Sequence, residues 1–194
     1  MRFLRWIGIA LAVLVLGLVA VAIVARSLDG PLRPLPFALL PGGPLRTGEL
    51  VTGPEPDWSF ARDIEVMEFQ LLEPARSRTI WLLVHEGKLY VACGYMNSWW
   101  GRLWKQWPHD AMEDGRAMIR IAGKRYEREA IRVTDPELFW SVVKESRRKY
   151  RPGEDKALPA LPDPLPPLEA TGVWLFELAP RSGAPTGTGS SPGS

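Results

Sequence analysis

The feature that most constrains this chain is an uninterrupted apolar segment near its N-terminus. The twenty residues from Trp6 to Ala25 include no charged side chain. At a rise of about 1.5 Å per residue, a helix of this length spans about 30 Å, which is the thickness of the hydrocarbon core of a bilayer. We therefore predict one transmembrane anchor within residues 1–27, with residues 6–25 in the membrane and Trp6 at an interface, where an amphipathic ring is favoured.

The charges on the two sides of this segment favour opposite orientations in the membrane. Arg2 and Arg5 precede it, and Arg26 and Arg33 follow it. The short basic leader favours a cytoplasmic N-terminus and export of the rest, whereas the later arginines favour the opposite orientation. We expect a single-pass protein of the cell membrane with its domain on the extracytoplasmic side. The alternative is a cleaved signal peptide, because residues 20–22 (Ala-Val-Ala) fit a cleavage site, although the apolar stretch exceeds the usual core of such signals.

Proline and glycine divide the rest of the chain into three parts. Residues 28–46 are rich in both, which predicts a semi-extended linker that holds the domain away from the bilayer. Residues 181–194 are almost entirely Ser, Gly, Thr, Pro and Ala, a composition typical of disorder. The remaining residues, 47–180, are long enough for one domain with its own core.

Charge and cysteine content argue against two classes of function. The net charge is +2 at pH 7, and the basic excess flanks the apolar segment, so we expect no nucleic-acid surface. The single cysteine, Cys93, excludes an intramolecular disulfide and a multi-cysteine zinc site. We interpret Cys93 as a small buried apolar residue rather than a reactive thiol.

Two hairpins dominate the pattern in the middle of the chain. An apolar run over Arg78–His85 is followed by a Glu86-Gly87 turn and a second run over Lys88–Cys93. A similar pair is predicted at residues 117–122 and 125–133, with a turn at Gly123-Lys124. Further strands are predicted at residues 48–52, 58–61, 64–72 and 172–178.

One helix is signalled late in the chain. Asp135 is a favoured capping residue, Pro136 suits the first turn, and Glu137 lies beside the positive end of the helix dipole. Apolar residues then recur at helical spacing to about Tyr150. Together with the hairpins, this predicts an α+β domain built on a small antiparallel barrel or sheet with one or two helices.

Known catalytic patterns are absent from the sequence. His85 and His109 have no acidic or histidine partner at ligand spacing, so we expect no metal site. The serines lack the context of a nucleophile elbow, and there is no phosphate-binding glycine motif. We therefore assign no catalytic residue.

The stretch from Tyr95 to Trp107 is unusual, because four tryptophans lie beside two cations. These residues are Trp99, Trp100, Trp104 and Trp107, with Arg102 and Lys105. The rings could close one end of the barrel, or stack on a planar anionic ligand that the cations pair with. They could also contact the membrane interface, where tryptophan and arginine collect.

The order of these segments resembles an uncharacterised bacterial family related to the flavin-binding split barrels, the superfamily of pyridoxamine 5'-phosphate oxidase. The matching segments, within residues 58–178, are W-S-F, R-T-I-W-L-L-V, E-G-K-L-Y-V, the tryptophan stretch, G-R-A-M-I-R-I-A-G-K-R-Y-E, the D-P-E-L helix and K-Y. The resemblance implies a split β-barrel. Because many split barrels complete their site across a dimer, it also implies a homodimer.

The resemblance also implies a cofactor site. By position, the cofactor-binding residues would be Arg78, Thr79, Ile80, Arg102 and Lys105, with an aromatic wall of Trp99, Trp100 and Trp104. The implied function is an oxidoreductase that depends on a flavin or deazaflavin, FMN or F420. The alternative is a non-enzymatic envelope module that binds a ligand or partner on an inert barrel, because bulky tryptophans replace small and polar residues in the cofactor loop. An open groove beside Arg78 would favour the first function.

Overall fold

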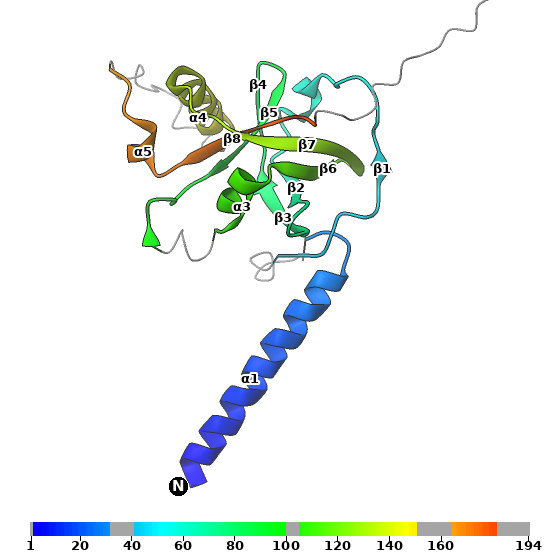
Figure 1. The fold of residues 1–194 in the computed structure, drawn as a ribbon, viewed down its shortest axis with the longest axis vertical. Coiled ribbons are helices and arrows are strands. Elements are labelled where there is room, and N and C mark those ends of the chain that lie inside the picture. Colours follow the sequence, from blue (N-terminus) through cyan, green and yellow to red (C-terminus); the bar gives the residue numbers. More distant parts are fainter. Residues whose placement is uncertain (1, 32–40, 100–104, 151–163, 182–194) are drawn as a thin grey trace, which may run out of the picture.

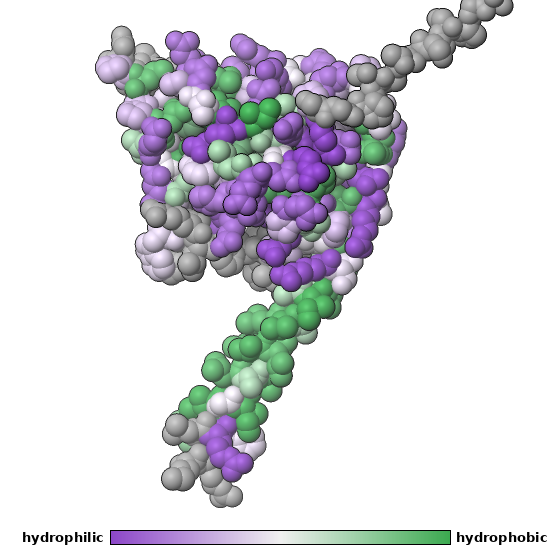
Figure 2. Space-filling view, in the orientation of Figure 1, coloured by the Kyte–Doolittle hydropathy of each residue, from purple (hydrophilic) through white to green (hydrophobic). Residues whose placement is uncertain are grey.

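The computed structural model describes residues 2–31, 41–99, 105–150 and 164–181. It opens with α1 (Arg2–Ser27), which extends away from a single domain (Figure 1). The part of α1 from Arg5 to Ser27 is long and apolar enough to cross a membrane, and its most apolar stretch is not buried, although Ala25 at its domain end is. Figure 2 shows that the surface of α1 is mostly hydrophobic, whereas the visible face of the domain is largely hydrophilic. The predicted anchor therefore has the required length and exposure.

The domain is one curled, mainly antiparallel sheet. Its strands are β1 (Glu49–Leu50), β2 (Val66–Leu71), β3 (Arg76–Trp81), β4 (Leu83–His85), β5 (Lys88–Cys93), β6 (Arg116–Ile121), β7 (Lys124–Arg132) and β8 (Trp174–Pro180). The strand order is β3-β2-β6-β7-β8-β5-β4, and β1 pairs in parallel with the start of β7. This architecture confirms the predicted α+β split barrel.

The strand order itself shows why the sheet curls. Its two terminal strands, β3 and β4, are consecutive in the sequence and are separated only by Leu82. A single residue could not connect the two edge strands of a flat sheet of seven strands, because neighbouring strands lie about 4.8 Å apart. The sheet must therefore bend until its ends meet at Leu82, which is fully buried.

Both predicted hairpins are present, with one shift in a turn. Glu86 and Gly87 connect β4 to β5 with φ values of 49° and 71°, as two-residue turns in hairpins require. The second turn lies at Ala122 and Gly123, with φ values of 49° and 79°, one residue earlier than predicted. A third hairpin, β2–β3, was not anticipated as such.

Two strand predictions are wrong in detail. Residues 58–61 form a 3-10 helix, η2 (Trp58–Ala61), because the Asp57 side chain caps it by accepting a hydrogen bond from the Ser59 amide at 2.9 Å. The run predicted as one strand over Arg78–His85 is two strands, because the chain leaves one edge of the sheet and joins the other at Leu82.

Among the described residues, three α-helices complete the domain: α3 (Trp107–Glu113), α4 (Pro136–Tyr150) and α5 (Leu168–Thr171). The predicted cap of α4 is confirmed, since the Asp135 carboxylate accepts from the Glu137 amide at 3.0 Å. One apolar cluster fills the barrel around Trp58, Phe69 and Phe176. A second cluster lies between the sheet and α4.

The described residues of the predicted linker, 28–31 and 41–46, do not form an extended spacer. Gly42 exchanges two backbone hydrogen bonds with Ser77 of β3, at 2.9 and 3.2 Å. The Leu45 amide donates to the buried Gln70 side chain at 2.6 Å. A Cβ atom on Gly43 would lie 2.0 Å from the backbone oxygen of Leu28, so the two halves of the segment touch. These described parts of the predicted linker therefore belong to the domain.

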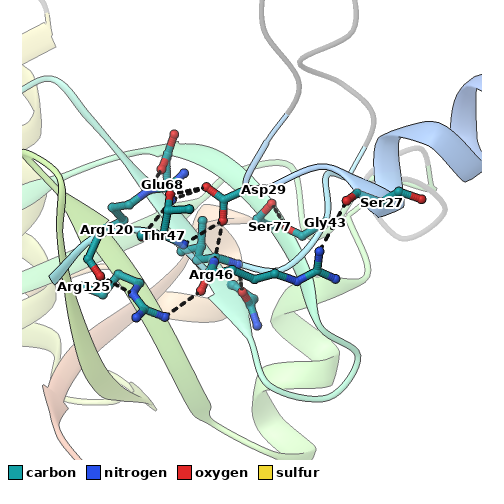
Figure 3. Close-up of polar contacts among 12 residues, drawn as sticks. Ser27, Asp29, Gly43, Arg46, Thr47, Glu68, Ser77, Arg120 and Arg125 are labelled. Carbon is teal, nitrogen blue, oxygen red and sulfur yellow. Dashed lines mark hydrogen bonds and ion pairs between the residues drawn. The ribbon is translucent and has the colours of Figure 1, made fainter. Parts of the chain in front are cut away.

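A polar junction fastens the end of α1 to the barrel (Figure 3). The Asp29 carboxylate accepts hydrogen bonds from the Thr47 hydroxyl and the Arg120 guanidinium, both at 2.6 Å, and from the backbone amides of Arg46 and Thr47. Arg120 also pairs with Glu68 of β2. Burial acts to raise the pKa of Asp29, but the hydrogen bonds from Thr47 and Arg120 dominate and hold it well below its ordinary value.

Candidate functional site

The predicted cofactor residues on β3 do not share one face of the sheet. Arg78 is paired with Phe69, and Ile80 with Met67, so these side chains point into the barrel. Thr79 is paired with Glu68 and points to the opposite face. The three positions therefore contribute side chains to two different environments.

Arg78 is a largely buried cation. Its guanidinium lies 5.8 Å from the centroid of the Trp107 ring. Burial lowers its pKa to about 10, against the opposing influence of Asp110. Its Nε atom has no hydrogen-bond partner among the residues that the structure describes. The site thus holds a positive charge that is incompletely satisfied.

Lys105 reaches the same region from the segment that precedes α3. Its Nζ atom donates to the Gly94 carbonyl at 3.1 Å and lies 5.3 Å from the Tyr95 ring centroid. Burial raises the pKa of the Cys93 thiol, while the charges of Lys105 and Arg78 oppose this rise. Arg78 and Lys105, the two predicted cations that the structure describes, therefore both act on Cys93, which is buried as expected.

The tryptophan stretch divides between the core and the surface. Trp107 is buried and packs against Phe69 and Phe176, at centroid distances of 5.2 and 5.4 Å, so it closes one end of the barrel. Trp99 is 63% exposed and so does not plug the barrel. Trp100, Arg102 and Trp104 lie outside the described residues.

A large cavity bordered by described residues lies elsewhere, between α4, the strands β4, β5 and β8, and the start of the tryptophan stretch. Its volume is about 920 Å³. Neither this cavity nor the smaller one beside Arg120 is lined by Arg78, Thr79, Ile80 or Lys105. The floor is apolar and consists of Leu83, Ala92, Val142, Val143, Val173 and Leu175.

The rim of this cavity is aromatic and polar. Trp81 stacks on Tyr150 with a centroid distance of 5.2 Å and an interplanar angle of 22°. Tyr95 also lines the cavity, and hydroxyl and amide groups complete its lining, from Asn97, Ser98, Ser146 and Thr171. The opening thus offers ring faces and hydrogen-bonding groups above a hydrocarbon floor.

The charged groups around the cavity are Glu65, Arg147 and Lys149. Lys149 is already engaged, because its ammonium donates to the carbonyls of Ile64 and Leu82. The Tyr150 hydroxyl accepts from the Leu82 amide at 3.0 Å and lies 2.7 Å from its carbonyl oxygen. Burial lowers the pKa of Lys149 and raises that of Tyr150 to about 12.

Arg147 differs from Lys149 because it is exposed and has no ion pair or hydrogen bond within the described part of the chain. It is thus the cation at the rim that a ligand can reach. Sequence reasoning missed this site, because basic residues in the last turn of a helix are already explained by the helix dipole. The available signal was Trp81, an aromatic residue within an apolar run of the sequence. In the structure its side chain is exposed.

The described lining of the cavity offers apolar contacts, ring faces and one exposed cation. Within residues 2–31, 41–99, 105–150 and 164–181, no group of three His, Cys, Asp or Glu side chains could hold a metal ion. Comparison with known proteins adds no relative, since no family model, curated protein or solved structure matches this chain.

Proposed function

We propose that this protein is a single-pass, membrane-anchored binding module whose barrel holds an amphiphilic anion in the cavity between α4 and the sheet. The observation that carries the proposal is the cavity of about 920 Å³, with an apolar floor and Arg147 at its rim. Small-molecule sites commonly enclose about 300–1,000 Å³ and combine apolar walls with few polar groups.

The lining supports a ligand with an apolar body and an anionic end. Each Å² of apolar ligand surface removed from water contributes about 25 cal/mol, so the floor favours hydrocarbon or ring systems. The Trp81 and Tyr150 pair offers a stacking face. The planar guanidinium of Arg147 suits a carboxylate or phosphate, which it can bind through two parallel hydrogen bonds.

A flavin-dependent oxidoreductase is the second candidate, and the observation in its favour is the approach of Arg78 and Lys105 to Cys93. The described residues nevertheless do not fit FMN or F420. Neither cavity is lined by these cations, and Lys105 already donates to a carbonyl. We therefore favour the binding module and attribute no chemical step to a flavin.

Calorimetric titration of the full chain in lipid nanodiscs tests the proposal. The probe is 2-naphthyl phosphate, which has one ring system and one anionic end, and FMN is titrated in parallel. Arg147→Gln should weaken naphthyl phosphate binding about fivefold, which corresponds to about 1 kcal/mol for an exposed charge-assisted contact. Val143→Trp should abolish binding by filling the floor.

Lys144→Gln is the matched control, because it removes the same charge from an exposed position of α4 that does not line the cavity. Its affinity should equal that of the unmodified protein. Absence of binding, or equal losses for Lys144→Gln and Arg147→Gln, would overturn the proposal. Uptake of FMN that survives Val143→Trp but not Arg78→Gln would instead support the flavin protein.

A further inference from the structure

The junction between α1 and the barrel fixes how the domain sits on a membrane. Asp29 is held by Arg120 and by two backbone amides, and Gly42 extends the sheet beside Ser77. The close approach of Gly43 to Leu28 leaves no slack between the two segments. Because α1 cannot swivel freely at this junction, one end of the barrel must face the bilayer that α1 spans.

The path of the chain identifies that end. β3 begins beside the junction, since Ser77 is bonded to Gly42. The chain then runs away through β4 to the turn at Glu86 and Gly87 and returns along β5. β5 ends at Cys93, near Arg78, and is therefore again close to the start of β3. In Figure 1 the β4–β5 turn lies at the top of the domain, and α1 leaves from the bottom.

The segment that follows β5 carries exposed aromatic rings at this membrane-facing end. Tyr95 is 76% exposed and Trp99 is 63% exposed. Figure 1 shows the described residues that follow β5 on the lower side of the domain, the side from which α1 departs. The backbone of Tyr95 has φ 67°, a left-handed conformation that is uncommon for an aromatic residue and turns the chain out of the sheet.

We infer that this segment, residues 94–99, is a second membrane contact, which rests on the lipid headgroups of the bilayer that α1 crosses. Tyrosine and tryptophan favour this interface, because their rings remain beside hydrocarbon while their polar atoms reach water. The ammonium of Lys105 donates to the Gly94 carbonyl and lies over the Tyr95 ring, so it helps to hold this segment in place. The barrel is thus held at two points, by α1 and by the aromatic segment.

The test is the depth of a spin label on the full chain in lipid nanodiscs. Ser98→Cys places the label beside Trp99 without removing it, and Glu86→Cys places the control label on the far turn. Cys93 can remain, because its thiol is buried and its raised pKa slows labelling. Collisions with oxygen, which concentrates in the bilayer, are compared with collisions with a water-soluble nickel chelate.

We expect the label at position 98 to collide often with oxygen and rarely with nickel, and the label at position 86 to show the reverse. Adding Trp99→Ser should increase nickel collisions at position 98, whereas Phe60→Ser, at another exposed aromatic residue, should not. Equal nickel collisions at the two labels would overturn the inference. Low collision rates with both reagents at position 98 would also overturn it, because they indicate burial in protein rather than in lipid.

Discussion

Replacing Asp29 with alanine should release the barrel from α1 while leaving the barrel folded. The substitution removes the acceptor for two backbone amides, one hydroxyl and one guanidinium. A neutral hydrogen bond contributes about 1 kcal/mol net, and one to a charged group about 1.5–3 kcal/mol. Because the Asp29 side chain is 28% exposed, we reduce the sum and expect a loss of about 3 kcal/mol at the junction.

Asp29→Asn separates the backbone contacts from the ionic ones. Its amide oxygen can still accept from the amides of Arg46 and Thr47, which both approach the same carboxylate oxygen. Its amide nitrogen replaces the oxygen that faces Arg120, so the charge pair is lost. We expect about half the effect of Asp29→Ala.

Hydrogen exchange of the full chain in nanodiscs measures the loss. Amides of residues 28–30 and 42–47 should lose about 100-fold protection in Asp29→Ala and about tenfold in Asp29→Asn, since about 1.4 kcal/mol corresponds to a factor of ten. Amides of β7 and β8 should keep their protection. Unchanged exchange in Asp29→Ala would refute the reasoning that this carboxylate holds the junction. Equal losses in the two variants would refute the division between backbone and ionic contacts.

Three further predictions follow from packing and titration. Gly43→Ala should destabilise the junction by about 2 kcal/mol, because the added methyl group would lie 2.0 Å from a backbone oxygen. The loss should be measured as faster hydrogen exchange at the junction. Gly53→Ala, at a glycine with open space around it, should have no effect. Tyr90 and Tyr150 should ionise only near pH 12 in an ultraviolet titration, because burial raises both pKa values above the ordinary 10.0. The stability of the fold should therefore fall from pH 10 upward. Ionisation of all tyrosines near pH 10 would contradict this prediction. Arg128→Lys should lower the melting temperature by about 4 °C or more, because lysine cannot keep both contacts to Glu55 and the stacking on the Trp58 ring. An unchanged melting temperature would show that these contacts do not stabilise the barrel.

The fold was largely predictable, because its signals are local. Alternating apolar residues and two-residue turns indicated the hairpins, and Asp135 indicated the start of α4. The junction was not predictable in this way, since Asp29 and Arg120 are 91 residues apart and the glycines of residues 42–43 indicate flexibility in isolation. Close approach of two backbones, rather than flexibility, is what those glycines permit.

The candidate site was less predictable than the fold. A strand pattern shows which residues alternate, but the inward direction of Arg78 depends on the register with β2. The cavity depends on how α4 packs against the sheet, and no local sequence pattern indicates the spacing between the helix and the sheet. Lys149 and Arg147 are two residues apart on one helix, yet only the structure distinguishes the engaged cation from the available one.

The placement of β3 and β4 at the ends of the strand order also determines how this domain would behave without α1. An edge strand with unpaired amides and carbonyls is a template for aggregation. β4 is only three residues long, and the pairing of Gly42 with Ser77 covers the start of β3. A soluble fragment that begins at Thr47 would lose that cover and expose β3 to other chains. One that begins at Leu28 retains it, together with Asp29, and is the form in which the barrel should remain monodisperse.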